Sequence, residues 1–470
     1  MKPSAIVDGR ITLRDIPEKT FERLRLAFSL PNPEFITKER YGGYTGDTPE
    51  TIDIADETPE GDLRLPRGSI RRIKEQIEKD GIKLDFEDHR ALGKPIENVS
   101  KPPLRFYQQE AADQILKHPQ GVVVLPCAGG KTRTGLGVVA SVSRTTLVLV
   151  PNDELLDQWV GHAGNEKEEP CGCVGLLGIV PGVLNAAKKE VEADVVIATT
   201  QSALAWAATH PGWTERFGLV IVDEAHRVAS YTYTKLMMAI PAKYRLALTA
   251  TPYRTDGLGI LIEWSFGHTL VQYSVDELAK LGFLVKPEIR FVKSPISLTH
   301  DPLDPRPLSK QLVSLHRELI ASTERNAFLV RLIVDEVAKG EVVLVLANNK
   351  TLCSTLVDCL KILEVDCELL TGAVSKRKRK GHVEAMRQGN LPCIIATSVA
   401  DEGLDLPRIS RIVLAFPESA RGRTTQRVGR LMRMFPGKKP VLIDIVDNHP
   451  TLTRRAAGRK RTYRELGLIQ

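Results

Sequence analysis

A glycine-rich segment has the residues needed to bind phosphate groups. Residues 125–132 read LPCAGGKT and lie between an apolar run and a run that is compatible with a helix. Small residues at 128–130 (Ala128, Gly129 and Gly130) let backbone N–H groups point at phosphate oxygens, and the following helix adds the positive end of its dipole. Lys131 is expected to reach the β- and γ-phosphates of ATP, and the Thr132 hydroxyl to bind Mg²⁺. The usual pattern has glycine at position 125, so a glycine-rich turn with a surface lysine is the alternative.

A pair of adjacent carboxylates follows another apolar run. Residues 221–226 read IVDEAH, and Asp223 lies 92 residues after Lys131. Two carboxylates at a strand end are costly unless they bind a metal ion or act on water. Asp223 suits coordination of Mg²⁺, and Glu224 suits polarisation of the attacking water. An exposed Asp-Glu turn is the alternative, but the phosphate loop upstream favours ATP hydrolysis.

Both motifs belong to a stretch in which short apolar runs alternate with helix-compatible segments. Such runs, rich in Val, Ile and Leu, are typical of buried parallel strands in an α/β domain. The expected strands are 121–125, 145–150, 195–198, 219–222 and 246–248, then 342–346, 367–370, 394–396, 412–415 and 441–443. The sequence therefore predicts an α/β fold with two doubly wound parallel-sheet domains in tandem.

Three domains are expected. Residues 1–100 would form a small α+β accessory domain that could bind DNA, 101–285 the first parallel-sheet domain, and 286–470 the second. Local features of these domains are a helix at 18–28, an acidic turn-rich stretch at 46–62, a basic helix at 69–79, a linker at 101–103, a surface loop at 300–307 and a basic tail at 454–464.

The composition is that of an ordinary globular protein. Hydrophobic residues make up 42% of the 470 residues, but no apolar run reaches the roughly 18 residues that a membrane span needs. No signal pattern is seen at the start, so a cytoplasmic protein without a membrane partner is expected. Seven cysteines suggest reduced thiols, and Cys171 and Cys173 lack a second pair that would complete a zinc site. The net charge of +7 is compatible with a nucleic-acid partner.

Taken in order over residues 104–440, the motifs clearly resemble those of the superfamily 2 helicases. They are LRFYQ at 104–108, the phosphate loop, LVLVPNDELLDQW at 147–159, IATTQS at 197–202, IVDEAH, LTATP at 248–252, ATSVADEGLDLP at 396–407 and QRVGRLMR at 426–433. Within that superfamily the chain looks closest to the XPB-like DNA helicases and their phage and bacterial relatives. Their PCGAGK loop is PCAGGK here, with alanine and glycine exchanged, and Arg254–Asp256 resembles their Arg-Glu-Asp element with Thr255 replacing glutamate.

The resemblance implies two RecA-like domains with ATP and Mg²⁺ between them. Gln108 is then expected to read adenine, and Gly403 and Asp405 to help close the cleft, with Asp405 near the ribose. From the second domain, Gln426 should lie near the γ-phosphate, with Arg430 and Arg433 as arginine fingers. His226, Thr249 and Thr251 are expected to couple the ATP site to the nucleic acid. A merely packed histidine is the alternative for His226, and a solvated helix face for the two arginines.

The resemblance also implies one nucleic-acid strand held mainly by its phosphates. The motif positions for such contacts are Thr200, Ser202, Thr371, Gly372 and Thr397. The basic run 376–380 is expected to begin a helix that continues to 387, and both this run and the tail are open as either binding sites or solvated faces.

The function expected from the resemblance is that of an ATP-dependent DNA helicase acting on duplex, forked or branched DNA. A duplex translocase that does not separate strands and an RNA helicase are the alternatives. A scaffold without activity is disfavoured, because degenerate members usually lose the lysine, the Asp-Glu pair or the finger arginines, and all are present here.

Overall fold

The computed structural model describes residues 2–40, 44–165, 169–228, 230–250, 257–298, 308–397, 406–418 and 421–470. The chain forms two compact units. The first consists of Met1–Leu125 with Gly130–Gln272, and the second of Pro126–Gly129 with Tyr273–Gln470.

The N-terminal region of the first unit is built on a mixed five-stranded sheet. Its strands follow the order β5-β6-β2-β1-β7, with β1 and β7 parallel and the other neighbours antiparallel. The strands are β1 Ser4–Val7, β2 Arg10–Arg14, β5 Asp56–Glu57, β6 Leu63–Pro66 and β7 Asp85–Asp88, and the helices are α1 Glu18–Ala27 and α3 Ile70–Glu78. A separate pair of strands, β3 Ser29–Pro31 and β4 Thr51–Asp53, flanks helix α2 Pro33–Arg40. The expected α+β character of this region is confirmed.

This region shares a core with the parallel sheet that follows it. One continuous cluster of buried hydrophobic side chains includes Leu13, Phe28 and Ile73 from the N-terminal region, together with Met237 and Phe266 from the later part of the unit. The first hundred residues are therefore packed as part of the first unit.

Two buried arginines join the same parts of the chain. Arg67, 1% exposed, donates to the carbonyls of Asp8 and Ala242 at 2.8 and 2.9 Å. Arg245, fully buried, donates to the carbonyl of Gly9 at 2.7 Å, and burial lowers its pKa to about 9. Because a buried guanidinium is costly without hydrogen-bond acceptors, these carbonyls hold the N-terminal region in one orientation on the sheet.

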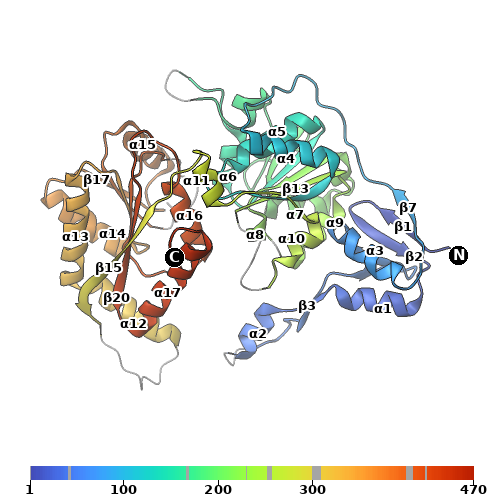
Figure 1. Cartoon of the computed structure of the whole chain (residues 1–470), viewed down its shortest axis with the longest axis horizontal. Coiled ribbons are helices and arrows are strands. Elements are labelled where there is room, and N and C mark those ends of the chain that lie inside the picture. The colour runs from blue at the N-terminus through green and yellow to red at the C-terminus, as the bar shows by residue number, and fades with distance from the viewer. Residues whose placement is uncertain are drawn as a thin grey trace. The chain divides into compact units, whose positions relative to one another are not determined.

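The parallel sheet of the first unit has seven strands in the order β10-β11-β9-β12-β13-β8-β14. The strands are β8 Gln120–Val124, β9 Thr146–Val150, β10 Gly182–Leu184, β11 Val195–Thr199, β12 Leu219–Val222, β13 Tyr244–Thr249 and β14 Thr269–Gln272. In Figure 1, α4 Phe106–Lys117 and α5 Lys131–Val142 lie on one face, and α7 Thr200–Thr209, α9 Tyr231–Ala239 and α10 Ile260–Phe266 lie on the other. Further helices of this unit are α6 Asp153–Val160 and α8 Ala225–Val228.

The second unit has six parallel strands in the order β15-β20-β19-β16-β18-β17. They are β15 Glu288–Ser297, β16 Val343–Leu346, β17 Cys367–Leu370, β18 Cys393–Ala396, β19 Arg411–Leu414 and β20 Val441–Asn448. Figure 1 shows α13 Thr323–Ala338 and α14 Lys350–Ile362 on one face, and α16 Arg421–Leu431 and α17 Pro450–Glu465 on the other. The remaining helices are α11 Val275–Lys280, α12 Leu308–Ala321 and α15 Lys376–Gln388.

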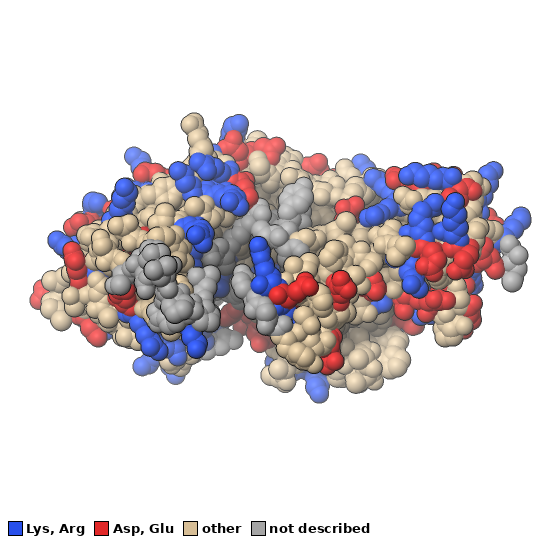
Figure 2. All heavy atoms as spheres, turned by 90° about the horizontal axis from the view of Figure 1, so that it is seen from below, with Lys and Arg blue, Asp and Glu red and all other residues tan. Residues whose placement is uncertain are grey.

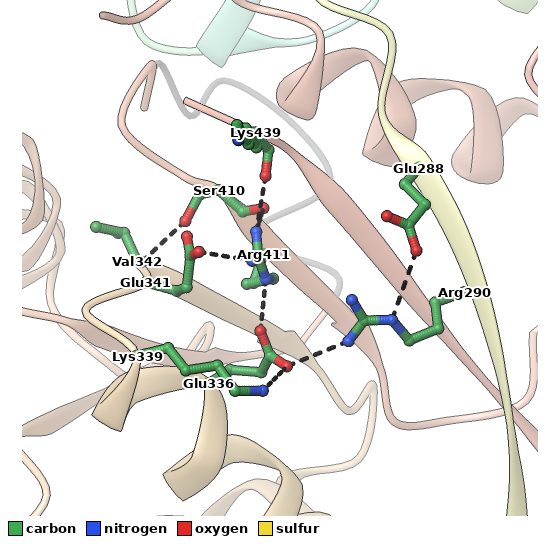
Figure 3. Close-up of polar contacts among 9 residues, drawn as sticks. All are labelled: Glu288, Arg290, Glu336, Lys339, Glu341, Val342, Ser410, Arg411 and Lys439. Carbon is green, nitrogen blue, oxygen red and sulfur yellow. Dashed lines mark hydrogen bonds and ion pairs between the residues drawn. The ribbon is translucent and has the colours of Figure 1, made fainter. Parts of the chain in front are cut away.

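An ion-pair network ties the amino-terminal edge of this second sheet to α13 (Figure 3). Arg411, the first residue of β19, contacts Glu336 Oε2 at 2.5 Å and Glu341 Oε1 at 2.6 Å. Arg290 of β15 reaches the other oxygen of Glu336 at 3.2 Å, and the Lys439 carbonyl accepts a further bond from Arg411. A half-buried network of this kind is stable only when its groups are paired, so it fixes the position of α13 on the sheet.

The tandem α/β fold predicted from the apolar runs is confirmed, and nine of the ten expected strands occur within one or two residues of their predicted bounds. The tenth, expected at 441–443, continues to Asn448 as β20. The expected helices at 18–28, 69–79 and 376–387 also occur, as α1, α3 and α15. Three edge strands, β10, β14 and β15, were not predicted. None of the helices in the described ranges has the length and apolar character that crossing a bilayer requires.

Candidate nucleotide-binding and catalytic site

The first unit brings three sequence motifs to neighbouring strand ends. Strands β12, β13 and β8 are adjacent and parallel, so their carboxyl ends meet at one edge of the sheet. The phosphate loop follows β8, the Asp223–Glu224 pair follows β12, and Thr249 is the last residue of β13. A hydrogen bond from the Leu125 N–H to the Thr249 carbonyl, 3.0 Å long, joins the loop to β13. This edge is where open α/β sheets bind ligands.

The phosphate loop has two residues in the left-handed region. Gly130, the N-cap of α5, has φ +79°, and Ala128 has φ +66°. A Cβ on Gly130 would lie 2.4 Å from Gln108 Nε2, so a larger residue would be strained at this φ and would displace the Gln108 amide. Alanine at 128 carries a conformational cost of about 1–2 kcal/mol. The exchange of alanine and glycine seen in the sequence thus puts the larger residue at a position that favours glycine.

Gln108 lies against this loop. It is 1% exposed, its Oε1 accepts the Arg105 N–H at 3.0 Å, and its Nε2 lies 3.5 Å from the Gly130 carbonyl. The side chain therefore links the start of α4 to the start of α5. Its assignment as the adenine-reading residue stays a prediction.

Asp223 is held by two donors in a buried position. Its Oδ2 accepts from Trp159 Nε1 at 2.9 Å, and its Oδ1 accepts from the Glu224 N–H at 2.9 Å. Burial raises the pKa of Asp223 to about 6, the neighbouring Glu224 carboxylate adds to the rise, and Lys131 opposes it. A divalent cation would offset this penalty, which supports Asp223 as a ligand of Mg²⁺.

Glu224 lies between two cationic or polar partners. Lys131 Nζ is 3.2 Å from Glu224 Oε1, and His226 Nδ1 is 3.4 Å from Oε2. Burial alone would raise the pKa of Glu224, but Lys131 and then His226 outweigh burial, so this pKa is lowered. His226 Nδ1 also lies 3.0 Å from Thr249 Oγ1. A continuous path of polar contacts thus runs from Lys131 to β13.

Two residues of α6 at this site were missed from the sequence. Gln158 Nε2 donates to Thr132 Oγ1 at 3.0 Å, and Trp159 supplies the bond to Asp223. Both belong to the motif LVLVPNDELLDQW at 147–159. Adjacent Gln and Trp at the end of an amphipathic helix give no sequence signal for a role beside a carboxylate.

The second unit carries the other predicted ATP-site residues on one helix and its end. Gln426 and Arg430 are four residues apart on α16, and Arg430 is 8% exposed. Arg433 follows the helix and is half-buried. Gly403, Asp405 and Thr251 lie outside the described residues, as do Arg254–Asp256 and the loop 300–307. The roles of Gln426, Arg430, Arg433, Gly403 and Asp405 at the ATP site, and of Thr251 in coupling, stay predictions.

The residues predicted to contact nucleic acid lie just after the carboxyl ends of β-strands. Thr200 is buried and donates to the Val150 carbonyl at 3.2 Å, and Ser202 accepts from Thr199 Oγ1 at 2.9 Å. In the second unit, Thr371 and Thr397 directly follow the adjacent strands β17 and β18 and are buried, and Gly372 is exposed. Each set lies at one edge of its own sheet, and phosphate contact by these residues stays a prediction.

The two basic segments differ in structure. Arg377, Lys378 and Lys380 are exposed in the first turns of α15, so this run stays a candidate for binding phosphates. The expectation of a tail at 454–464 is wrong, because these residues lie within α17. Arg459 of this helix is 2% exposed and forms an ion pair with Asp444. Positive charge in the sequence did not reveal that buried partner. On the face shown in Figure 2, lysine and arginine are interspersed with aspartate and glutamate.

Two family models match the chain. Residues 101–254 match the model described as "Type III restriction enzyme, res subunit", and residues 324–435 match "Helicase conserved C-terminal domain". The first range includes the phosphate loop and the Asp223–Glu224 pair, and the second includes Arg430 and Arg433.

Relatives over most of the chain are named helicases or translocases. The chain is 29% identical to the DNA 3'-5' translocase XPB2 of Sulfurisphaera tokodaii, over 74% of this chain and 82% of that protein. It is 26% identical to the DNA 3'-5' helicase XPB of Mycobacterium tuberculosis (77% and 64%), and 24% identical to the "Probable helicase D10" of Escherichia phage T5 (83% and 82%). The chain spans between 55% and 82% of the length of the three relatives matched first.

Solved structures share the fold. Dbp5 of S. cerevisiae, bound to RNA and ADP BeF3, matches with a TM-score of 0.53 at 15% identity, over 78% of this chain and 88% of that one. The restriction-modification enzyme LlaBIII, bound to DNA, matches with a TM-score of 0.55 at 15% identity, over 78% and 30%. At such identities the likeness shows the tandem α/β fold alone.

Proposed function

Because the chain belongs to the superfamily 2 helicases, we propose that it is an ATP-dependent DNA helicase that couples ATP hydrolysis to movement on duplex-containing, forked or branched DNA. The observation that carries the ATPase part is the contact path from Lys131 through Glu224 and His226 to Thr249. It joins a phosphate-binding loop, a carboxylate and the next strand of the sheet in one buried site.

Glu224 is suited to act on water in this site. Its lowered pKa keeps the carboxylate ionised near neutral pH. Its Oε2 is buried and accepts no hydrogen bond from the described part of the chain, although His226 Nδ1 lies 3.4 Å away. An ionised carboxylate with an available oxygen can orient a water molecule and take its proton. Lys131 would bind the phosphates, and its contact with Glu224 would change when they are bound.

The residues present also fit Mg²⁺. The Thr132 hydroxyl and the Asp223 carboxylate are the oxygen ligands that this cation prefers, and both are oriented by neighbours on α6. When bound, Mg²⁺ neutralises charge on the phosphate oxygens. Trp159 and Gln158 would keep the two ligands in place as it exchanges with each round of hydrolysis.

DNA as the substrate is supported by the names of the relatives and by the motif positions at the sheet edges. A motor that moves along a strand must hold it mainly by phosphates and almost independently of sequence. Its affinity should then fall steeply with salt, with a log–log slope of about −0.7 for each phosphate neutralised on a single strand.

The test is ATP hydrolysis and strand separation on matched forked DNA and forked RNA over a salt series. We expect stronger stimulation by the DNA and separation of its strands. Stimulation by duplex DNA without strand separation would instead identify a duplex translocase. Stronger stimulation by RNA would contradict the proposal. So would an affinity for nucleic acid that does not change with salt concentration and depends on base sequence.

A further inference from the structure

Three arginines converge on the short segment 415–418, which leads from β19 into α16. Two come from the C-terminal helix α17 and one from α13, and each donates to a backbone carbonyl. The contacts are Arg459 Nη1 to Glu418 O (2.6 Å), Arg455 Nη1 to Pro417 O (2.9 Å) and Arg325 Nη2 to Ala415 O (2.8 Å). Three separate guanidinium groups thus hold three carbonyls of this four-residue segment.

Two of these arginines are themselves held by buried carboxylates of β20. Asp444, fully buried, accepts from Arg459 Nε at 2.9 Å and Nη2 at 2.5 Å, and from the Tyr463 hydroxyl at 2.8 Å. Asp447, 1% exposed, accepts from Arg325 Nε and Nη2 at 2.7 and 2.9 Å. Two-pronged pairs of this kind have a fixed geometry, so the guanidinium groups cannot shift without breaking the pair.

The same segment is joined to the helix that follows it. The Glu418 carboxylate forms ion pairs with Arg423 at 2.9 Å and with Arg427 at 2.8 Å, both on α16, and Arg427 is 3% exposed. Arg427 immediately follows Gln426 and lies one turn before Arg430. Continuous contacts therefore run from α17 through 415–418 to the part of α16 that bears Arg430.

We propose that Arg455, Arg459 and Glu418 are positioning residues for Arg430 and its helix, so that the C-terminal helix sets the geometry of ATP hydrolysis from within the second unit. The inference rests on the proposed function. Charge stabilisation in phosphoryl transfer depends on placement, and a displacement of about 1 Å can cost about 100-fold in rate. A helix whose positive charge suggests DNA binding thereby acts on the ATP site.

Arg455 offers the sharpest test. It is half-exposed, and its main partner is a carbonyl, so its removal leaves no buried charge unpaired. Arg454, next to it on α17, is exposed and serves as the matched control. We expect Arg455→Ala to lower kcat about tenfold, with the KM for ATP and the affinity for DNA changed less than about twofold. Arg455→Lys, which can still donate to the Pro417 carbonyl, should restore part of the rate, and Arg454→Ala should match the wild type.

A double-mutant cycle separates positioning from other roles. If Arg455 acts through Arg430, then Arg455→Ala should lower the residual rate of Arg430→Ala less than about twofold, because the effects of coupled residues are not additive. Glu418→Gln, which keeps the side-chain shape, should behave like Arg455→Ala in the same cycle and serves if the alanine variant unfolds.

Two results would overturn the inference. One is a full tenfold loss in the Arg430→Ala background. The other is a loss that appears as weaker DNA binding in both Arg454→Ala and Arg455→Ala, which would make α17 a DNA-binding helix. A wild-type protein without nucleic-acid-stimulated hydrolysis would instead contradict the proposed function.

Discussion

The buried Asp223 leads to a prediction about stability and its dependence on pH. An aspartate whose pKa is about 6 in the folded protein and 3.8 in the unfolded chain takes up a proton on folding. The free energy of unfolding therefore decreases as the pH rises from about 4 through about 6, and the ionised carboxylate costs about 3 kcal/mol above that range. Asp223→Asn removes this cost.

The asparagine keeps only part of the local hydrogen bonding. Asp223 accepts from Trp159 through one oxygen and from the Glu224 N–H through the other, but an amide has a single acceptor oxygen. The loss of one hydrogen bond lowers the free energy of unfolding by about 1 kcal/mol. We therefore expect Asp223→Asn to stabilise the ligand-free protein near neutral pH by about 2 kcal/mol, or roughly 4–8 °C in the unfolding temperature of the first unit.

The assay is thermal unfolding of the wild type and Asp223→Asn between pH 4.5 and 8, with a chelator and without nucleotide. The difference between them should grow with pH and level off above about pH 7. Asp47→Asn, at an exposed position of the same unit, controls for the substitution itself. Added Mg²⁺ and ATP should stabilise the wild type but not the variant. A difference that is constant with pH, or a destabilised variant at pH 8, would refute the reasoning about burial.

Five other substitutions test the ATP site. Lys131→Ala should abolish turnover by weakening phosphate binding, whereas Glu224→Gln should bind ATP nearly normally and fail to hydrolyse it; substantial turnover by the latter would remove Glu224 from its role. Arg430→Ala and Arg433→Ala should each lower kcat about 10³-fold or more while changing the KM for ATP little, since the charge they meet develops in the transition state; a KM effect alone in steady-state kinetics would assign them to ground-state binding. Ala128→Gly should stabilise the protein by about 1 kcal/mol in thermal unfolding, because φ +66° disfavours alanine and the flexibility of unfolded glycine offsets only part of the gain; no gain would show that the loop relaxes around alanine.

The sheet cores were predictable because buried parallel strands are continuous apolar runs, such as those of β9 and β12. The strand β15, EIRFVKSPIS, was missed because an edge strand with exposed faces carries polar and charged residues between its apolar ones. The motifs identified Lys131, Asp223 and Glu224 as candidate site residues, and the order of the strands in the sheet brings them together.

Other features depend on contacts between distant parts of the chain. Trp159 is 64 residues from Asp223, and nothing local marks it as a donor to that carboxylate. The charge run in α17 was interpreted as a solvent-exposed tail because Asp444, its buried partner, lies in an apolar strand where a carboxylate is unexpected. The hydrophobic periodicity of a sequence indicates which face of an element is buried, but it does not identify the polar group that a buried side chain contacts.

The arginines that join the N-terminal region to the first sheet have a consequence for the order of events during synthesis. Gly9 accepts from Arg245, which is 236 residues later in the chain. At about 5–20 residues per second, a ribosome needs roughly 10 to 50 seconds to deliver that partner. Until then the face of the N-terminal sheet that packs on Met237 and Phe266 stays open to water. Within the first unit, the part that emerges first thus completes its packing only when the end of the unit has been made. A chaperone that covers apolar surface would be needed longest at that sheet.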